Sequence, residues 1–193
     1  MAVEAVVFDV GETLVDETAN WERAADEAGV PRFTLMALVG AAIERGDSHR
    51  WALDRLGIRP SRSAFLHDHW YPDAVACLAR LREGGLIVGA AGNMAVEHEE
   101  LLRPHVAFAT SSERLGVEKP AAGFFERLAG LAGVEPARIA YVGDRVDNDV
   151  LPALAAGMVA VHVRRGPWGH LHEPPEDAIC IRSLDELPGA LPA

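Results

Sequence analysis

The sequence lacks the features of membrane-spanning, disulfide-bonded and nucleic-acid-binding proteins. Its longest useful apolar run, residues 34–43, falls well short of the roughly 20 residues that a membrane-spanning helix needs. The two cysteines, Cys77 and Cys180, are too few to indicate a disulfide framework or a zinc site. Lys and Arg number 18 against 29 Asp and Glu, a formal net charge of −11. This balance argues against nucleic acids and anionic membranes as partners.

The N-terminus also lacks the pattern of an export signal. Glu4 and Asp9 lie where such a signal needs a basic start and an uninterrupted apolar stretch. We therefore expect a cytoplasmic protein. With 193 residues, 49% of them hydrophobic, the chain can bury a sizeable core, and its length indicates one domain, with or without an insertion. No feature indicates an oligomeric state.

Apolar runs and helical patterns alternate along most of the chain. Residues 17–70 contain helical patterns and no convincing strand, which predicts a small helical insertion. After the insertion, Ala74, Cys77, Leu78 and Leu81 form one helical face, which makes Cys77 most simply a core residue. Outside the insertion we expect strands at 6–8, 86–90, 106–109, 138–142, 159–163 and 179–181, and helices at 95–102, 121–132 and 148–156. This order predicts an α/β fold, a mostly parallel sheet with helices on both faces.

The first strand ends in the run Phe8-Asp9-Val10-Gly11-Glu12-Thr13. Ligands of open α/β sheets bind beyond the carboxyl ends of the strands, so an acid that ends a strand faces the binding crevice. Asp9 is therefore the candidate nucleophile. A nucleophilic aspartate needs a cation, a positive side chain and amide donors nearby, and later segments of the chain have to supply them.

Two later segments offer a phosphate-binding loop and a positive charge. Gly92-Asn93 ends a strand just before a helix, where Asn93 is either an ordinary N-cap or part of a phosphate-binding loop. Lys119 precedes Pro120, which we expect in the first turn of the next helix. A lysine there meets the positive end of the helix dipole, so it either points into solvent or compensates an anion in the crevice.

The last such segment is Gly143-Asp144 with Asn148-Asp149. Asp147 and Asp149 are common residue types at a helix start and need no function to explain them. Asp144, by contrast, ends an apolar strand as Asp9 does. If the two strands are neighbours, the two carboxylates converge, and a proton or a hard cation relieves their repulsion. Mg²⁺, which takes one or two carboxylates, waters and a phosphate oxygen, suits this arrangement.

Taken in this order, the four motifs resemble those of the haloacid dehalogenase-like (HAD) hydrolase superfamily over nearly the whole chain. The resemblance implies a Rossmann-like core at residues 1–15 and 71–193, with a helical cap at 16–70. It implies that Asp9 attacks phosphorus to form an aspartyl-phosphate and that Gly92, Asn93 and Lys119 bind the phosphate. It further implies that Asp9, the Gly11 carbonyl and Asp144 hold Mg²⁺, that Asp149 orients the metal's waters or Lys119, and that Thr13 supports the turn around Asp9.

Two positions depart from the pattern of the family's phosphatases. Gly11 stands where an aspartate usually protonates the leaving oxygen and then activates water, and such general acid–base help contributes about 10²–10⁴-fold. Gly92 stands where a serine or threonine usually gives a hydroxyl to the phosphate. Glu12 is the nearest replacement acid, although neighbouring positions in an extended turn need not point the same way. We expect Gly11→Asp to raise phosphatase activity if the rest of the site is competent.

Three functions fit these residues. The first is a Mg²⁺-dependent phosphatase that acts on a small phosphorylated metabolite, weak or restricted to good leaving groups. The second is a metal-independent 2-haloacid dehalogenase, whose relatives also lack the second aspartate. The third is a non-catalytic protein that kept the fold and the cation. Magnesium dependence separates the first from the second.

Two pairs of polar residues carry weaker signals. His67 and His69 are two residues apart, which places them on different sides of a helix and disfavours a shared metal. Arg164 and Arg165 follow the last main strand. They form either an anion contact at the crevice mouth or a surface pair, and we favour the surface pair.

Overall fold

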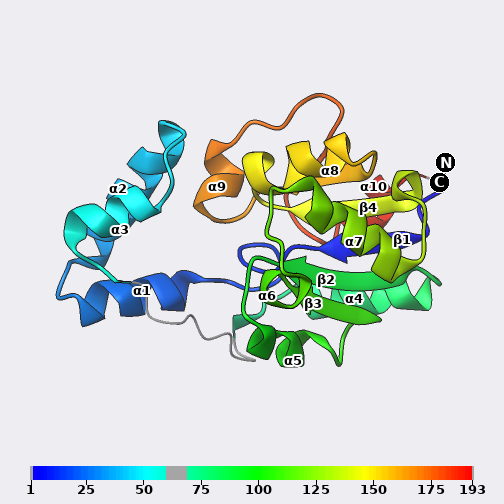
Figure 1. The fold of residues 1–193 in the computed structure, drawn as a ribbon, viewed down its shortest axis with the longest axis horizontal. Coiled ribbons are helices and arrows are strands. Elements are labelled where there is room, and N and C mark those ends of the chain that lie inside the picture. The colour runs from blue at the N-terminus through cyan, green and yellow to red at the C-terminus, as the bar shows by residue number, and fades with distance from the viewer. Residues whose placement is uncertain (1, 60–68, 193) are drawn as a thin grey trace.

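The computed structural model describes residues 2–59 and 69–192 and contains a parallel sheet with the strand order β3-β2-β1-β4-β5-β6 (Figure 1). The strands are β1 (Ala5–Phe8), β2 (Ile87–Gly92), β3 (Phe108–Ser111), β4 (Ile139–Gly143), β5 (Val159–Val163) and β6 (Ile179–Ile181). β1 lies between β2 and β4 and all four of its residues are buried, as a continuous apolar run predicts for a strand covered on both faces.

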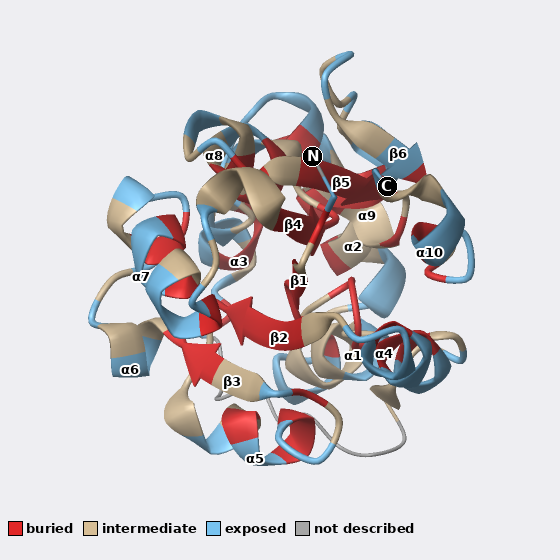
Figure 2. Cartoon of the chain, turned by 90° about the vertical axis from the view of Figure 1, so that its right-hand side faces the viewer, coloured by how far each residue is buried: buried red, intermediate tan, exposed pale blue. Residues whose placement is uncertain are grey.

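Helices cover both faces of the sheet, and their apolar sides form two separate cores. The helices outside the insertion are α4 (Ala74–Glu83), α5 (Glu99–Leu102), α6 (Ser112–Leu115), α7 (Ala122–Ala132), α8 (Leu151–Ala155), α9 (Gly166–Leu171) and α10 (Leu187–Ala190). α4, α5 and α10 contribute to one core, α7 and α8 to the other. Figure 2 shows the buried strands at the centre and the exposed sides of α4 and α7 turned outward. Cys77, in α4, is fully buried as predicted.

Three helices between β1 and α4 form a third apolar cluster. They are α1 (Thr18–Glu27), α2 (Arg32–Glu44) and α3 (Arg50–Leu56), and Figure 1 shows them beside the sheet rather than over it. Trp168 of α9 packs into the same cluster. Among the described residues of 17–70 there is no strand, only an isolated bridge at Trp70. The division into a core and a cap at 16–70 stays a prediction.

Some element boundaries differ from those expected. β3 begins at Phe108 instead of residue 106, and Val106 is a core residue of the segment that precedes it. The helix expected at 95–102 is a 3₁₀ turn, Val96–His98, followed by α5. The helix expected at 148–156 begins with a π-helical turn, Val146–Val150. α7 begins at Ala122, so Pro120 precedes the helix and is not in its first turn.

The order of the strands in the sheet brings the residues after β1 and β4 together. Residues that follow β1 and β4 leave the same edge of the sheet side by side, because Phe8 is aligned with Val142. The next amide, that of Asp9, donates a 2.8 Å hydrogen bond to the Val142 carbonyl. None of the helices in the described part of the chain is long and apolar enough to cross a membrane.

Candidate active site

Three aspartates converge at the carboxyl ends of β1 and β4. Asp9 follows β1, Asp144 follows β4, and Asp149 lies in the π-helical turn after it. One carboxylate oxygen from each lies within 4.8 Å of the others, and all three residues are buried. The sequence placed Asp9 and Asp144 at one crevice if their strands were neighbours, and the structure gives that arrangement.

Lys119 supplies the positive charge among these acids. Its Nζ lies 2.7 Å from Asp9 Oδ1 and 2.5 Å from Asp149 Oδ1. Its side chain is completely buried, so of the two alternatives the lysine faces anions in the crevice and not solvent. Burial alone would lower the pKa of Lys119, but the carboxylates of Asp149 and Asp9 outweigh it and hold the pKa well above its usual value. The lysine is therefore a fixed cation next to the candidate nucleophile.

Asn93 holds the backbone of Lys119 in place. Its Nδ2 donates to the Lys119 carbonyl at 2.9 Å, and its Oδ1 accepts from the Lys119 amide at 2.8 Å. Asn93 does not cap a helix, since the helical turn that follows is preceded by Ala95. The N-cap interpretation of Asn93 is thus wrong. The amide side chain joins the loops after β2 and before α7, a long-range contact that local spacing does not reveal.

Asp149 holds the lysine from the opposite side. Its Oδ1 pairs with Lys119, and its Oδ2 accepts a 3.0 Å hydrogen bond from the Arg145 amide. A Cβ atom on Gly143 would lie 2.5 Å from the Asp149 carboxyl, so this approach requires glycine. Burial raises the pKa of Asp149 to about 6, although Lys119 opposes the shift. Both oxygens are engaged, so of the two implied roles the geometry favours orienting Lys119.

Asp144 is the acid that most needs a cation. Its Oδ2 is buried with no hydrogen-bond partner among the described residues. Burial, followed by the charges of Asp149 and Asp9, raises the pKa of Asp144 well above its usual value. The His162 ring lies 2.9 Å from the Asp144 carbonyl through Nε2 and fixes the backbone there, a contact that sequence reasoning missed. Asp144, Asp9 and the nearby Gly11 line one cavity, and this all-oxygen donor set fits Mg²⁺.

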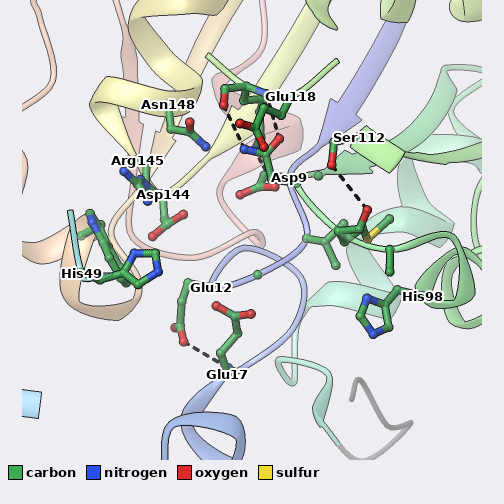
Figure 3. Close-up of a pocket in the computed structure, with 18 of the residues that line it drawn as sticks. Asp9, Glu12, Glu17, His49, His98, Ser112, Glu118, Asp144, Arg145 and Asn148 are labelled. Atoms are coloured by element: carbon green, nitrogen blue, oxygen red, sulfur yellow. Dashed lines mark hydrogen bonds and ion pairs between the residues drawn. The ribbon is translucent and has the colours of Figure 1, made fainter. Parts of the chain in front are cut away.

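The turn after Asp9 is fixed by side chains that point away from the nucleophile. Glu12 has a positive φ of 52°. Its carboxylate accepts from the Tyr71 hydroxyl at 2.6 Å and from the Glu17 amide at 3.1 Å. Figure 3 shows this carboxylate directed toward the backbone of Glu17. Glu12 is therefore engaged in holding the turn, and the candidacy that sequence adjacency gave it as a replacement acid loses its support.

Thr13 and Arg165 lie beneath the same turn. Thr13 is completely buried and does not line the cavity, while its carbonyl accepts a 2.8 Å hydrogen bond from Arg165. Arg165 is also buried and pairs with Asp73. The surface-pair interpretation is wrong for Arg165, because the turn and α4 enclose it. It fits Arg164, which pairs with the exposed Glu173. His67 lies outside the described residues, so the interpretation of the His67 and His69 pair stays untested.

Asp9 and Asp144 line a cavity of about 580 Å³. Its outer wall includes Trp21 of α1, His49 just before α3, and Trp168 of α9. The His49 ring packs edge-on against both tryptophans, with centroids 5.7 and 5.8 Å away. Sequence reasoning missed these residues. The residues lining the cavity carry no shared spacing and meet only because α1 to α3 pack against α9.

Glu17 also lines the cavity and was not anticipated. Figure 3 shows its side chain rising into the cavity from the start of α1, below Asp9. Burial, together with the charges of Glu12 and Asp9, raises the pKa of Glu17 to about 8. The sequence held only an indirect signal for Glu17, which is that a glycine at position 11 leaves room near Asp9 for another side chain. Sequence alone does not say which side chain fills that room.

An open parallel sheet with an aspartate at the end of its central strand, a buried lysine beside it and two further buried aspartates fits a class of hydrolase that works through a carboxylate nucleophile. Sequence comparison gives the family. The haloacid dehalogenase-like hydrolase family matches residues 3–157, and the chain belongs to it. The predicted family, α/β fold and hydrolase class are thereby confirmed.

Individual relatives agree with this assignment. The chain is 33% identical, over an alignment of 217 positions, to a glyceraldehyde 3-phosphate phosphatase of Methanopyrus kandleri. The alignment covers 95% of this chain and 93% of the relative. The chain is 32% identical to a glyceraldehyde 3-phosphate phosphatase of Methanocaldococcus jannaschii, covering 61% of this chain and 54% of the relative. A crystal structure of a dehalogenase superposes with a TM-score of 0.73 at 21% identity, covering 99% and 98% of the two chains. That last likeness concerns the fold alone.

Proposed function

We propose that this protein is a Mg²⁺-dependent phosphatase that hydrolyses a small phosphorylated metabolite through an aspartyl-phosphate on Asp9. The observation that carries the proposal is the placement of Lys119 Nζ between Asp9 and Asp149, at 2.7 and 2.5 Å, beside the unpaired Asp144 Oδ2. A fixed cation at this point stabilises the negative charge that accumulates as a phosphoryl group is transferred.

The residues divide the work as follows. Asp9 attacks phosphorus, and Lys119 offsets the charge of the carboxylate and of the phosphoryl oxygens. Asn93 and Asp149 are positioning residues, because each holds Lys119 by hydrogen bonds. The loop at Gly92 lies against the nucleophile, since a Cβ atom there would come within 3.0 Å of Asp9 Oδ1. This leaves space for phosphoryl oxygens where the family usually has a hydroxyl-bearing side chain.

Asp9, Asp144 and the Gly11 carbonyl would hold the magnesium ion. Bound there, Mg²⁺ would screen the negative charge of the phosphate and the carboxylates from one another. The support lies in the donor set: two buried carboxylates, one of them with an orphaned oxygen. The cytoplasmic location expected from the sequence stays a prediction.

The cavity and the relatives together favour a small substrate. A volume of about 580 Å³ suits a metabolite and not a polymer. Since two relatives are phosphatases of glyceraldehyde 3-phosphate, phosphorylated three-carbon compounds are the first substrates to test. The aromatic and histidine wall at Trp21, His49 and Trp168 would contact the part of the substrate that is not phosphate.

The test is a screen of phosphorylated metabolites and short 2-haloacids, with Mg²⁺ or with a chelator, in which the Asp9→Asn variant serves as the blank. We expect phosphate release that needs both Mg²⁺ and Asp9. Halide release that persists in chelator would contradict the proposal and favour the dehalogenase alternative. Phosphate release that survives Asp9→Asn would also overturn it.

A further inference from the structure

The geometry points to Glu17 as the acid–base group of this phosphatase, supplying from the start of α1 the carboxyl group that residue 11 lacks. The inference rests on the proposed function. It assigns to Glu17 the two proton transfers that a phosphatase with an aspartyl-phosphate requires. No local motif marks this residue, because it is eight positions beyond the nucleophile and outside the Asp9 turn.

The first argument is the space next to Gly11. A Cβ atom built on Gly11 would lie 2.8 Å from Glu17 Cδ and 2.9 and 3.0 Å from the two carboxyl oxygens. The Glu17 carboxyl therefore occupies the region into which the carboxyl of an aspartate at position 11 would project. Gly11 does not have a positive φ, so its backbone does not demand glycine. A side chain at residue 11 would have to displace the Glu17 carboxyl from this position.

The second argument is that the backbone of Glu17 is held so that its side chain enters the cavity. The Glu17 amide donates to Glu12 Oε1 at 3.1 Å, and its carbonyl accepts from the amides of Asn20 and Trp21. Its side chain does not cap α1. Figure 3 shows the carboxyl directed up into the cavity while that of Glu12 is turned away. Of the two glutamates near the turn, only Glu17 is aimed at the reacting atoms.

The chemistry balances with one carboxyl group. In the first step an Asp9 oxygen bonds to phosphorus, the bond from phosphorus to the leaving oxygen breaks with its electron pair on that oxygen, and the Glu17 carboxyl gives it a proton. The alcohol departs and leaves Asp9 phosphorylated and Glu17 ionised. In the second step the Glu17 carboxylate takes a proton from water as the water oxygen bonds to phosphorus. The bond to Asp9 breaks, its electrons return to the carboxylate, and inorganic phosphate leaves.

The test compares leaving groups in the full-length protein with Mg²⁺. A good leaving group needs no proton, so Glu17→Gln is expected to lower kcat/KM about 10²–10⁴-fold for an alkyl phosphate and far less for para-nitrophenyl phosphate. The variant is also expected to accumulate phosphorylated Asp9, detected by mass spectrometry after acid quench, because water is no longer activated. Glu27→Gln, an exposed acid on the same helix, is the matched control and should change neither quantity.

A second variant keeps the test decisive if Glu17 also affects folding. Glu17→Ala empties the space beside Gly11, so the double variant Gly11→Asp/Glu17→Ala should recover much of the alkyl phosphatase activity lost in Glu17→Ala alone. Gly11→Asp by itself should give no gain, because two carboxyl groups then compete for one space. This revises the gain expected for Gly11→Asp from the sequence.

Three results would overturn the assignment of Glu17. The first is that Glu17→Gln loses kcat/KM equally for both phosphates and shows no phosphorylated Asp9. The second is that the main effect of Glu17→Gln is a weaker Mg²⁺ affinity, measured by calorimetry. The third is that Gly11→Asp alone raises the alkyl phosphatase activity. The proposed function would remain in each case, since it fails only if wild-type protein releases no phosphate or if Asp9→Asn still does.

Discussion

The ends of the strands and the wall formed by α1 to α3 contribute to one cavity in different ways. Asp9 and Asp144 are placed by the alignment of β1 with β4, which backbone hydrogen bonds fix. Glu17 and His49 lie at the starts of α1 and α3, two helices that belong to a separate apolar cluster. The strand ends thus carry the acids that the motifs predicted, whereas the helical wall carries groups whose positions depend on packing. The predictions below test this contrast.

Lys119→Met should have the largest effect at the strand ends. Loss of a fixed cation beside the developing charge is expected to lower kcat/KM for phosphate esters about 10²–10³-fold. It also leaves Asp9 and Asp149 facing each other without the ammonium group, so we expect a stability loss of about 3–5 kcal/mol. Steady-state kinetics and urea unfolding measure the two effects. Activity within twofold of wild type would contradict the role of Lys119.

Asn93→Ala should have an intermediate effect because it acts through Lys119. It removes two hydrogen bonds to the Lys119 backbone, for which we expect about a 10-fold lower kcat. If Asn93→Ala raised KM alone and left kcat unchanged, Asn93 would contact substrate directly and would not be a positioning residue.

Glu17→Gln should change stability in a pH-dependent way on the helical wall. The pKa of Glu17 is raised from 4.5 to about 8 in the folded protein, so the folded state binds this proton more tightly than the unfolded chain. Glu17 therefore contributes to the free energy of unfolding of the wild type at low pH, and this contribution is lost as the pH rises toward 8. Glutamine does not titrate. In chelator we expect Glu17→Gln to be more stable than wild type by about 1–3 kcal/mol near pH 8 and almost equal near pH 5.

The measurement is urea unfolding of both proteins across that pH range, with Glu27→Gln as the control. A difference that is independent of pH, or that grows toward low pH, would contradict the burial of the Glu17 carboxyl in an acidic cavity.

His49→Ala should have the smallest effect and sharpen the contrast between the two regions. His49 lines the outer wall and packs on Trp21 and Trp168. We expect KM to rise about 3–10-fold with kcat nearly unchanged, the signature of lost uniform binding. Phe33→Ala, an 85% exposed aromatic of α2, should alter neither constant. A fall in kcat without a change in KM would place His49 in the chemistry.

The sequence predicts the fold and the strand-end acids well because both follow from local patterns. Apolar runs locate the strands, and an acid after each run faces the crevice once the strands are parallel and adjacent. The roles of Asn93 and Arg165 do not follow in this way. Asn93 contacts Lys119 across 26 positions, and Arg165 contacts Thr13 across 152. Such contacts depend on three-dimensional packing, so a capping residue and a surface pair were the local interpretations.

The same limit explains Glu17 and Glu12. Adjacency to Asp9 made Glu12 the nearest replacement acid, but its positive φ directs the carboxylate to Tyr71 and to the Glu17 amide. Glu17 reaches the empty side of Gly11 only because α1 begins there. A missing side chain in a motif therefore predicts a space, and the structure is needed to identify the residue that fills it.

The central claim is that Asp9 becomes phosphorylated during turnover, and peptide mass spectrometry tests it most directly. Wild-type protein, mixed with Mg²⁺ and a phosphorylated three-carbon substrate and quenched in acid, should carry a phosphoryl group on the peptide that contains Asp9. With para-nitrophenyl phosphate, whose leaving group needs no proton, Glu17→Gln should carry more of it than wild type, and Asp9→Asn should carry none with either substrate. Turnover with no phosphorylated peptide in wild type or in Glu17→Gln, or with the phosphoryl group on another residue, would contradict the account.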